Sequence, residues 1–293
     1  MTNIHFIINP IAGSAEHDFS EHYFQEFFEK EKYNLTVKLS EHKGHAIDLT
    51  KASINQGVNV IVACGGDGTI NEVASTLIGV NIPLGIIPVG SGNGLASNLK
   101  ISRNVEQAIQ IIKKNEQTRI DVGCINERYF FSNSGFGFDA NVIENYEASQ
   151  KRTLYCYVRA SIKSFMEFNK KNKMTINING NTIIDNPFLI FVSNSNELGY
   201  NVSLTPKASL QDGLLDILIV PKINKLKMVL FGVLVLLKRP HLLKGVKSFQ
   251  TKAMTLSRKT GEAFESQIDG EFIKIKEQSV SIHLKEKSLV VIV

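Results

Sequence analysis

The feature that most constrains the fold is a nearly continuous apolar run, Val58–Ala63, that leads into a glycine-rich turn, Gly65–Thr69. A run without polar alternation is typical of a strand that is covered on both faces of its sheet. The spacing of apolar residues in Thr69–Leu77 predicts a helix immediately after the turn. Because parallel strands need such crossover connections, this order predicts one unit of a parallel α/β sheet.

Strand and helix patterns alternate in the same way through residues 1–121. This order predicts an N-terminal α/β domain in three layers, with a parallel sheet in the middle. Strands are expected at Ile4–Ile8, Leu35–Leu39, Val58–Ala63 and Leu84–Ile87, and helices at Phe19–Lys32, Ala46–Gln56, Thr69–Leu77 and Val105–Lys114.

The pattern changes near Asp121, and strand-like runs dominate residues 122–284. This part of the chain predicts a mostly antiparallel β-sandwich or barrel, interrupted by one helix at Tyr155–Asn169. The pattern of Ser288–Val293 predicts a further strand, which could join either domain. The other strands are expected at Tyr129–Ser132, Met174–Ile178, Phe188–Ser193, Leu215–Val220, Ala253–Leu256 and Val280–Leu284.

Glycine-containing turns follow three of the expected strands of the first domain, at Asn9–Gly13, Gly65–Thr69 and Pro88–Gly94. Glycines let a backbone approach a ligand closely, and N–H groups at a helix start favour phosphate. Any one of these turns could be a tight connection without a ligand. Because the carboxyl ends of parallel strands lie at one edge of the sheet, three such turns together favour a phosphate site there.

Several common nucleotide motifs do not fit these turns. A P-loop is excluded because no Lys follows the glycines of Gly65–Thr69. A dinucleotide-binding fingerprint is disfavoured because Asn71 stands at its third glycine position. The following strand also ends in Ile87-Pro88, without an acid for a ribose, and protein-kinase HRD and DFG elements are absent.

The charge is unevenly distributed. The chain of 293 residues has a net charge of +5, yet the segment Ile217–Gly261 contains no Asp or Glu. In its middle lies Met228–Leu237, an apolar run that is too short to span a bilayer. It could form a core helix or lie in a membrane interface. A nucleic-acid partner is not expected, because these cations cluster with apolar rather than aromatic residues and no usual motif is present.

The chain start and the cysteines favour a cytoplasmic protein. MTNIHFIINP has no basic region ahead of its apolar residues, so a leader peptide is not expected. Cys64, Cys124 and Cys156 are widely spaced, which favours reduced thiols.

GGDGT at Gly65–Thr69, with NPxxG at Asn9–Gly13 and PxGSGN from Pro88, resembles the diacylglycerol kinase catalytic-domain family of lipid kinases. The family includes bacterial diacylglycerol kinases and sphingosine and ceramide kinases. The resemblance extends over the whole chain, through Ser132–Asp139, Leu210–Asp216 and Ile268–Glu271. It implies an α/β nucleotide-binding domain, a β-sandwich lipid-acceptor domain, a final strand 285–293 that returns to the first domain, and ATP between the two.

The resemblance also implies roles for single residues. Asp67 would organise Mg²⁺ through water, since Mg²⁺ keeps several waters when one or two carboxylates bind it. Ser40 would lie near the nucleotide, and Ser91 would contact it. The remaining nucleotide-binding residues would be Asn9, Pro10, Ile11, Ala12, Gly13, Gly65, Gly66, Asp67, Gly68, Thr69, Ile70, Asn71, Glu72, Gly92 and Asn93.

A second group of acids would carry out the chemistry. Asp269 or Glu271, with Asp269 favoured, would take the proton from the lipid hydroxyl, as phosphoryl transfer to a hydroxyl requires a nearby carboxylate. Ser209, Asp212 and Leu214 match a structural Mg²⁺ site of bacterial members. A turn role is the alternative for Asp212-Gly213 and for Asp269-Gly270.

The third turn departs from bacterial diacylglycerol kinases, which usually have GTxNDFA where this chain has Gly90–Ala96. It resembles the sphingosine kinase form, so the acceptor is left open between diacylglycerol and a sphingosine-like lipid. A kinase with a soluble acceptor, such as NAD kinase, and a non-catalytic sensor are the alternatives. Peripheral contact with an anionic membrane at its inner face is expected, and a homodimer is left open.

Overall fold

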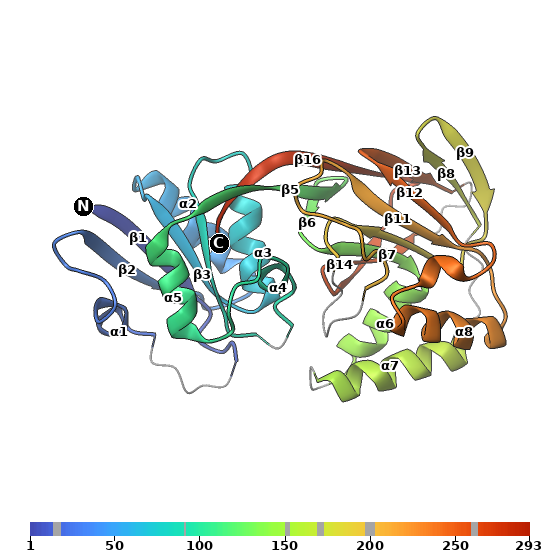
Figure 1. Cartoon of the computed structure of the whole chain (residues 1–293), viewed down its shortest axis with the longest axis horizontal. Helices are drawn as coiled ribbons and strands as arrows, with labels where there is room; N and C mark the ends of the chain where they lie inside the picture. Colours follow the sequence, from blue (N-terminus) through green and yellow to red (C-terminus); the bar gives the residue numbers. More distant parts are fainter. Residues whose placement is uncertain (14–18, 91, 150–152, 169–172, 197–202, 259–262) are drawn as a thin grey trace. The chain divides into compact units, whose positions relative to one another are not determined.

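The computed structural model describes residues 1–13, 19–90, 92–149, 153–168, 173–196, 203–258 and 263–293 (Figure 1). The chain divides into two compact units. Unit 1 comprises Met1–Ile120 and Lys287–Val293, and unit 2 comprises Asp121–Glu286. No helix within these described ranges is long and apolar enough to cross a membrane.

Unit 1 is built on a parallel sheet with the strand order β2-β1-β3-β4-β16. Every residue of β3 and β4 is buried, so both faces of the sheet are covered at its centre, as the apolar runs predict. The strands are β1 (Thr2–Ile8), β2 (Tyr33–Leu39), β3 (Val60–Gly65), β4 (Leu84–Pro88) and the end of β16 (Ser279–Ile292).

Helices connect these strands, and they follow the predicted pattern with two exceptions: the short helix at Gly94–Asn98 was not expected, and the first helix is much shorter than predicted. The elements are α1 (Glu21–Gln25), α2 (His45–Asn55), α3 (Asp67–Leu77), α4 (Gly94–Asn98) and α5 (Val105–Lys114). The expected helix over Phe19–Lys32 is wrong, because only α1 is helical there. Phe24 stacks on Phe6 at 4.0 Å between ring centroids, so aromatic packing produces the spacing that a longer helix would have.

Unit 2 is a sandwich of antiparallel sheets. One has the order β12-β11-β10-β7-β14-β15, and the other contains β16, β13, β8 and β9. Between them lies a core that includes Phe136 and Ile217 from one sheet and Ile176 and Met254 from the other. The strands are β5 (Gln117–Ile125), β6 (Arg128–Phe130), β7 (Asn133–Gly137), β8 (Met174–Ile178), β9 (Asn181–Asp185), β10 (Leu189–Ser193), β11 (Leu215–Val220), β12 (Lys247–Thr251), β13 (Ala253–Ser257), β14 (Phe264–Ile268) and β15 (Glu271–Ile275).

The helical content of unit 2 differs from the prediction. Besides α7 (Leu154–Glu167), which corresponds to the expected helix, the described residues form α6 (Phe138–Glu147), α8 (Lys225–Leu236) and the short 3₁₀ helix η1 (Pro240–Leu242). Phe231 of α8 packs in a second apolar cluster with Phe188 and Leu218 of the sandwich. The two separate strands expected at Val280–Leu284 and Ser288–Val293 are one strand, β16, that runs from unit 2 into unit 1.

The prediction of fold class is thus confirmed: a parallel α/β domain is followed by an antiparallel β-sandwich.

Candidate active site

The three glycine turns of unit 1 meet one another. The N–H of Asn9 donates to the carbonyl of Cys64 at 3.0 Å, and the N–H of Val89 donates to the carbonyl of Gly65 at 3.0 Å. A Cβ at Gly13 would lie 2.5 Å from the carbonyl oxygen of Val89, and one at Gly90 would collide with the backbone of Gly66. Glycine at these positions is therefore needed for the turns to approach.

Helix α3 begins inside this group of turns, with Gly66 as an N-cap that offers no side chain. The first N–H groups of a helix have no partner within the helix. In the part of the chain that the structure describes, the N–H groups of Gly68 and Thr69 have no hydrogen-bond acceptor. A helix start of this kind, at the carboxyl end of a parallel strand, suits a phosphate group.

Asp67 holds the third turn in place. Its Oδ2 accepts the N–H of Asn93 at 2.8 Å, and its Oδ1 accepts the N–H of Gly94 at 2.6 Å, at the start of α4. Burial raises the pKa of the Asp67 carboxyl, while these two N–H groups and the charge of Arg103 act in the opposite direction. Both carboxylate oxygens thus already bind backbone, which leaves contact with a metal through water as the simpler arrangement.

The third turn also closes on itself. Asn93 has a left-handed backbone, with φ 58°. Its side-chain oxygen accepts the N–H of Gly90 at 3.0 Å, and its amide nitrogen donates to the carbonyl of Gly90 at 2.6 Å. The Arg103 guanidinium donates to the carbonyl of Gly92 at 2.8 Å. Ser91, the predicted contact in this turn, lies outside the described residues.

The other predicted residues of unit 1 surround these turns. Ser40 follows β2, and its N–H donates to the carbonyl of Ile8 at 2.8 Å, directly before the first turn. The Glu72 carboxylate accepts the N–H of Gly44 at 2.8 Å, which links α3 to the start of α2. The rest comprise Asn9, Pro10, Ile11 and Ala12 of the exposed first turn and Thr69, Ile70 and Asn71 in the first turns of α3.

Asp269, in unit 2, has a similar place in a different turn. It has φ 46° in the hairpin between β14 and β15. Its Oδ2 accepts the N–H of Phe131 at 2.8 Å, and its Oδ1 accepts the N–H groups of Ser132 and Asn133 at 2.8 and 3.0 Å. Three backbone N–H groups occupy the carboxylate, so Asp269 binds the connection from β6 to β7. Glu271 is half-buried at the first position of β15.

Gln267, Asp139 and Asn133 support this hairpin. Asn133 and Asp139 lie in the motif Ser132–Asp139, but none of the three was expected to be a catalytic or ligand-binding residue. The Gln267 side-chain oxygen accepts the N–H of Gly270 at 2.8 Å, and its amide donates to Asn133 Oδ1 at 2.8 Å and to Asp139 Oδ2 at 2.7 Å. Burial raises the pKa of Asp139 to about 6 against the opposing hydrogen bond from Gln267. A Cβ at Gly135 would collide with the Asp139 carboxylate, so that position requires glycine.

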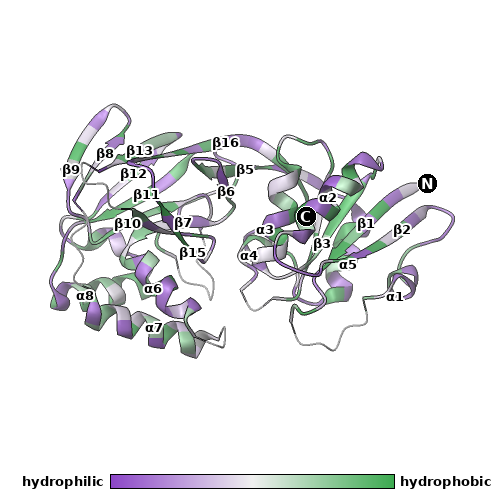
Figure 2. Cartoon of the chain, turned by 180° about the vertical axis from the view of Figure 1, so that it is seen from behind, coloured by the Kyte–Doolittle hydropathy of each residue, from purple (hydrophilic) through white to green (hydrophobic). Residues whose placement is uncertain are grey.

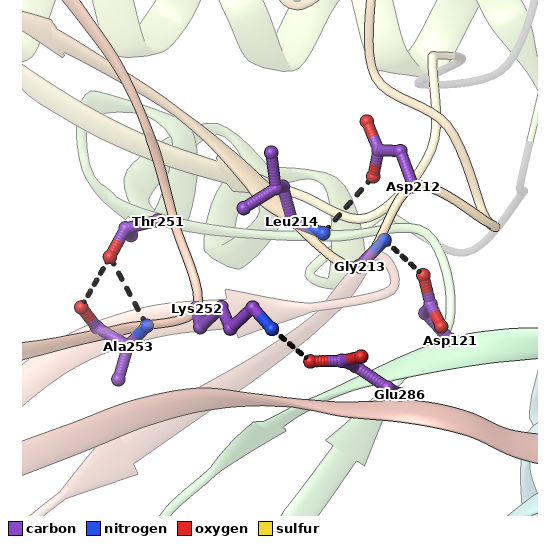
Figure 3. A network of polar contacts seen from close by, with 8 residues as sticks. All are labelled: Asp121, Asp212, Gly213, Leu214, Thr251, Lys252, Ala253 and Glu286. Atoms are coloured by element: carbon purple, nitrogen blue, oxygen red, sulfur yellow. Dashed lines mark hydrogen bonds and ion pairs between the residues drawn. The ribbon is translucent and has the colours of Figure 1, made fainter.

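Asp212 and Leu214, two residues of the expected second metal site, lie in one turn (Figure 3). Asp212 is exposed, and its Oδ1 accepts the N–H of Leu214 at 3.1 Å. Ser209, the third residue, lies shortly before them in the chain, and its Oγ accepts the N–H of Gln211 at 3.3 Å. Asp121 Oδ2 accepts the N–H of Gly213 at 2.8 Å. Across the ranges that the structure describes, no cluster of three or more His, Cys, Asp or Glu side chains could hold a metal by itself.

The two family models that match the chain meet near the start of unit 2. The diacylglycerol kinase catalytic domain matches residues 3–125, and the YegS C-terminal NAD kinase β-sandwich-like domain matches residues 133–291. The chain carries a diacylglycerol kinase catalytic domain and belongs to the family of the YegS C-terminal domain, whose model matches more than half of it. It is therefore an enzyme, a lipid kinase.

Similar proteins agree with this family. Curated diacylglycerol kinases from Staphylococcus aureus strains JH9 and Newman are each 28% identical over 249 residues, which cover 83% of this chain and 78% of the relative. A crystal structure of a diacylglycerol kinase from Bacillus anthracis str. Sterne superimposes with a TM-score of 0.78 at 21% identity, covering 99% of this chain and 96% of that one. At that identity the structure supports the fold.

Proposed function

We propose that this lipid kinase transfers the γ-phosphoryl group of ATP, with Mg²⁺, to a hydroxyl of diacylglycerol or of a sphingosine-like lipid. The observation that carries the proposal is the meeting of three glycine turns at the start of α3, where two N–H groups lack an acceptor within the described residues. The names of the Staphylococcus aureus relatives favour diacylglycerol as the first acceptor to test.

In this proposal, residues 1–121 and 285–293 bind the nucleotide, and residues 122–284 bind the lipid. The N–H groups of Gly68 and Thr69 bind phosphate, and Asn9–Gly13, Ser40 and Ser91 complete the nucleotide site. Asp67 serves mainly to shape the site, because its two oxygens hold the start of α4. A bound Mg²⁺ would neutralise charge on the phosphates. Contact with Asp67 through a water would suit Mg²⁺, which keeps several water ligands when it binds to proteins.

The hydrogen bonds of Asp269 bear on the choice of base. A general base needs an oxygen that can accept the proton of the substrate hydroxyl. Asp269 gives its oxygens to three backbone N–H groups, so we assign it to holding the turn. Glu271 is two residues further along and is half-buried. We therefore propose Glu271 as the base, which reverses the preference drawn from the sequence.

The second metal site, at Ser209, Asp212 and Leu214, is proposed to be structural and not catalytic. Ser209 and Leu214 would offer carbonyl oxygens, and Asp212 its exposed carboxylate, to a Mg²⁺ that stabilises the turn before β11. Oxygen donors of this kind suit Mg²⁺. No step of the reaction depends on this site.

A soluble acceptor is the second candidate, because the C-terminal family model is described as NAD kinase-like. One assay separates the two: ATP consumption with Mg²⁺ against diacylglycerol, monoacylglycerol, sphingosine, ceramide, NAD and a blank, with the lipids in anionic mixed micelles. We expect turnover with one lipid, lost in Glu271→Gln. Turnover with NAD alone would replace the lipid, and ATP binding without turnover on any acceptor would favour a sensor.

We further propose that the enzyme works in the cytoplasm, at the inner face of an anionic membrane. A bilayer is where a lipid acceptor is found, and the acid-free segment Ile217–Gly261 supplies positive charge for contact with it. A homodimer is compatible with this arrangement, and sedimentation equilibrium tests for it.

A further inference from the structure

Two neighbouring helices of unit 2 each present a line of exposed apolar side chains. Tyr155, on α7, is 74% exposed and Leu226, on α8, is 79% exposed. Residues spaced by three or four positions lie on one side of a helix. The exposed apolar residues with this spacing are Tyr155, Val158, Ile162 and Met166 on α7, and Leu226, Val229, Leu230, Val233, Leu236 and Leu237 on and just after α8.

The opposite sides of these helices already pack in the protein. Met228 and Phe231 of α8 are buried in the cluster under the helix, and Phe165 and Phe168, at the end of α7, pack against the same cluster. The exposed lines are therefore additional to the sides that fold unit 2. Hydrophobic and hydrophilic residues mix along both helices in Figure 2. A surface on which many apolar side chains are exposed side by side usually marks a binding site.

The end of α7 and the start of α8 lie side by side (Figure 1). The Lys225 ammonium donates to the carbonyl of Met166 at 3.4 Å. A cavity of about 570 Å³ lies where they meet, lined by Met166, Phe168, Ile223 and Met228 together with Lys222 and Lys225. The two apolar lines thus belong to one region, which we call the α7–α8 surface.

The charges of the α7–α8 surface are mostly positive. Arg159 and Lys163 are exposed on α7, where Glu167 at the end of the helix is the exposed acid. The exposed cations of α8 and its flanks are Lys222, Lys225, Lys227, Lys238, Arg239 and Lys244. No Asp or Glu offsets them between Ile217 and Gly261.

We propose that the α7–α8 surface docks on an anionic lipid bilayer. Its apolar side chains would enter the boundary between headgroups and acyl chains, and its cations would face the anionic headgroups. A second copy is a poorer occupant, because two such surfaces would bring like charges together. The inference rests on the proposed function only in that a lipid acceptor places the enzyme at a bilayer. It adds α7, which had no part in the membrane contact expected from sequence.

The test is co-sedimentation of the full chain with vesicles, without ATP or any acceptor lipid. Vesicles of phosphatidylcholine alone are compared with vesicles that also contain phosphatidylserine. Wild type should bind the anionic vesicles and release them as salt is raised. Lys227→Glu/Lys244→Glu should weaken binding by more than about tenfold, since each charge contributes roughly fivefold. Leu230→Ser/Val233→Ser should weaken it by a similar factor, and the exposed positions keep the fold intact.

The matched control is Lys51→Glu/Lys114→Glu, which makes the same charge change at exposed positions of unit 1. It should bind within about twofold of wild type, because charge near the bilayer is what matters. Equal loss in the control, or full binding by Leu230→Ser/Val233→Ser, would overturn the proposal. The proposal would also be overturned if wild type does not bind vesicles and is a dimer in sedimentation equilibrium that Leu230→Ser/Val233→Ser converts to a monomer.

A second assay keeps this proposal apart from the kinase itself. Phosphorylation of a water-soluble short-chain diacylglycerol does not require docking, so the surface variants should keep wild-type turnover on it. Turnover on the short-chain lipid without vesicle binding would refute docking and leave the kinase intact. Vesicle binding without turnover would do the reverse.

Discussion

Asp67 in unit 1 and Asp269 in unit 2 stand in glycine-rich motifs, and each binds a connection distant in sequence. Asp67 accepts the N–H groups of Asn93 and Gly94, and Asp269 accepts those of Phe131, Ser132 and Asn133. The two acids differ in the kind of element that begins at or just after them. Asp67 is the first residue of a helix whose next N–H groups lack an acceptor among the described residues, whereas Asp269 precedes a strand that begins with Glu271.

This comparison shows that an acid in a functional motif can bind backbone before it binds a ligand. A carboxylate holds backbone N–H groups more strongly than a neutral acceptor does. Each acid thus fixes a turn, and in the proposed function the neighbouring groups, N–H donors in unit 1 and Glu271 in unit 2, would act on the substrate. Substitutions in both units can test this division of roles.

Removing the Asp269 carboxylate should have the largest effect on stability. Asp269→Ala leaves three N–H groups of buried residues without their acceptor, so we expect a loss of about 4 kcal/mol in the free energy of unfolding of unit 2. Urea denaturation followed by circular dichroism measures it. Asp269→Asn is the control, because its side-chain oxygen keeps part of the acceptor, and it should lose about half as much. An Asp269→Ala protein as stable as wild type would contradict the assigned role.

Asp139, which supports the Asp269 hairpin through Gln267, predicts a pH dependence. Its pKa is raised from 3.8 to about 6 in the folded state, so folding favours the protonated form. The corresponding stability is complete below pH 3.8 and is lost as pH rises through about 6. Asp139→Asn keeps a polar partner for Gln267 without the charge, so it should be more stable than wild type at pH 7, by on the order of 3 kcal/mol.

Unfolding curves between pH 4 and pH 7.5 measure this difference. The stabilisation by Asp139→Asn should be small at the acid end and grow until about pH 6. A variant that is less stable than wild type at every pH would show that the Asp139 charge is itself needed for the fold.

Asp67→Ala should cost less stability than Asp269→Ala, because two N–H groups lose their acceptor rather than three. We expect about 2 kcal/mol, together with about tenfold weaker ATP binding as the third turn loosens. Isothermal calorimetry measures the affinity. If Asp67→Ala binds ATP as tightly as wild type, the third turn does not contribute to the nucleotide site.

Glu72 provides the smallest test of unit 1. Glu72→Ala removes the acceptor of the Gly44 N–H at the start of α2, which should cost about 1 kcal/mol. Glu72→Gln keeps an acceptor oxygen and should recover most of that loss in the thermal midpoint. No difference between the two variants would mean that this hydrogen bond does not stabilise unit 1.

The sequence predicted unit 1 better than unit 2, for a physical reason. Strands such as β3 and β4 are buried on both faces and read as apolar runs. In unit 2, β7 and β14 bury polar side chains that bond to one another: Ser134 Oγ donates to the carbonyl of Gln267 at 2.6 Å, and Ser266 Oγ to that of Gly135 at 3.0 Å. Such strands lack an apolar pattern, and both were missed.

The candidate site was predictable to the level of its motifs. The three glycine turns were found because glycine and strand ends are visible in sequence. The partners of the acids were not, since the hydrogen bonds of Asp269 span 136 to 138 residues. Gln267 directly precedes Ile268-Asp269-Gly270, and its place beside the motif is the one signal that could have indicated a supporting role.

The most direct test of the proposed roles is to measure the turnover of two variants, Glu271→Gln and Asp269→Asn, on diacylglycerol with ATP and Mg²⁺. If Glu271 is the base and Asp269 holds the turn, Glu271→Gln should lower kcat by about 10²–10⁴ with ATP affinity and thermal midpoint unchanged. Asp269→Asn should lower the midpoint instead. Near wild-type turnover by Glu271→Gln, with turnover lost in a fully folded Asp269→Asn, would contradict the account and return the chemistry to Asp269.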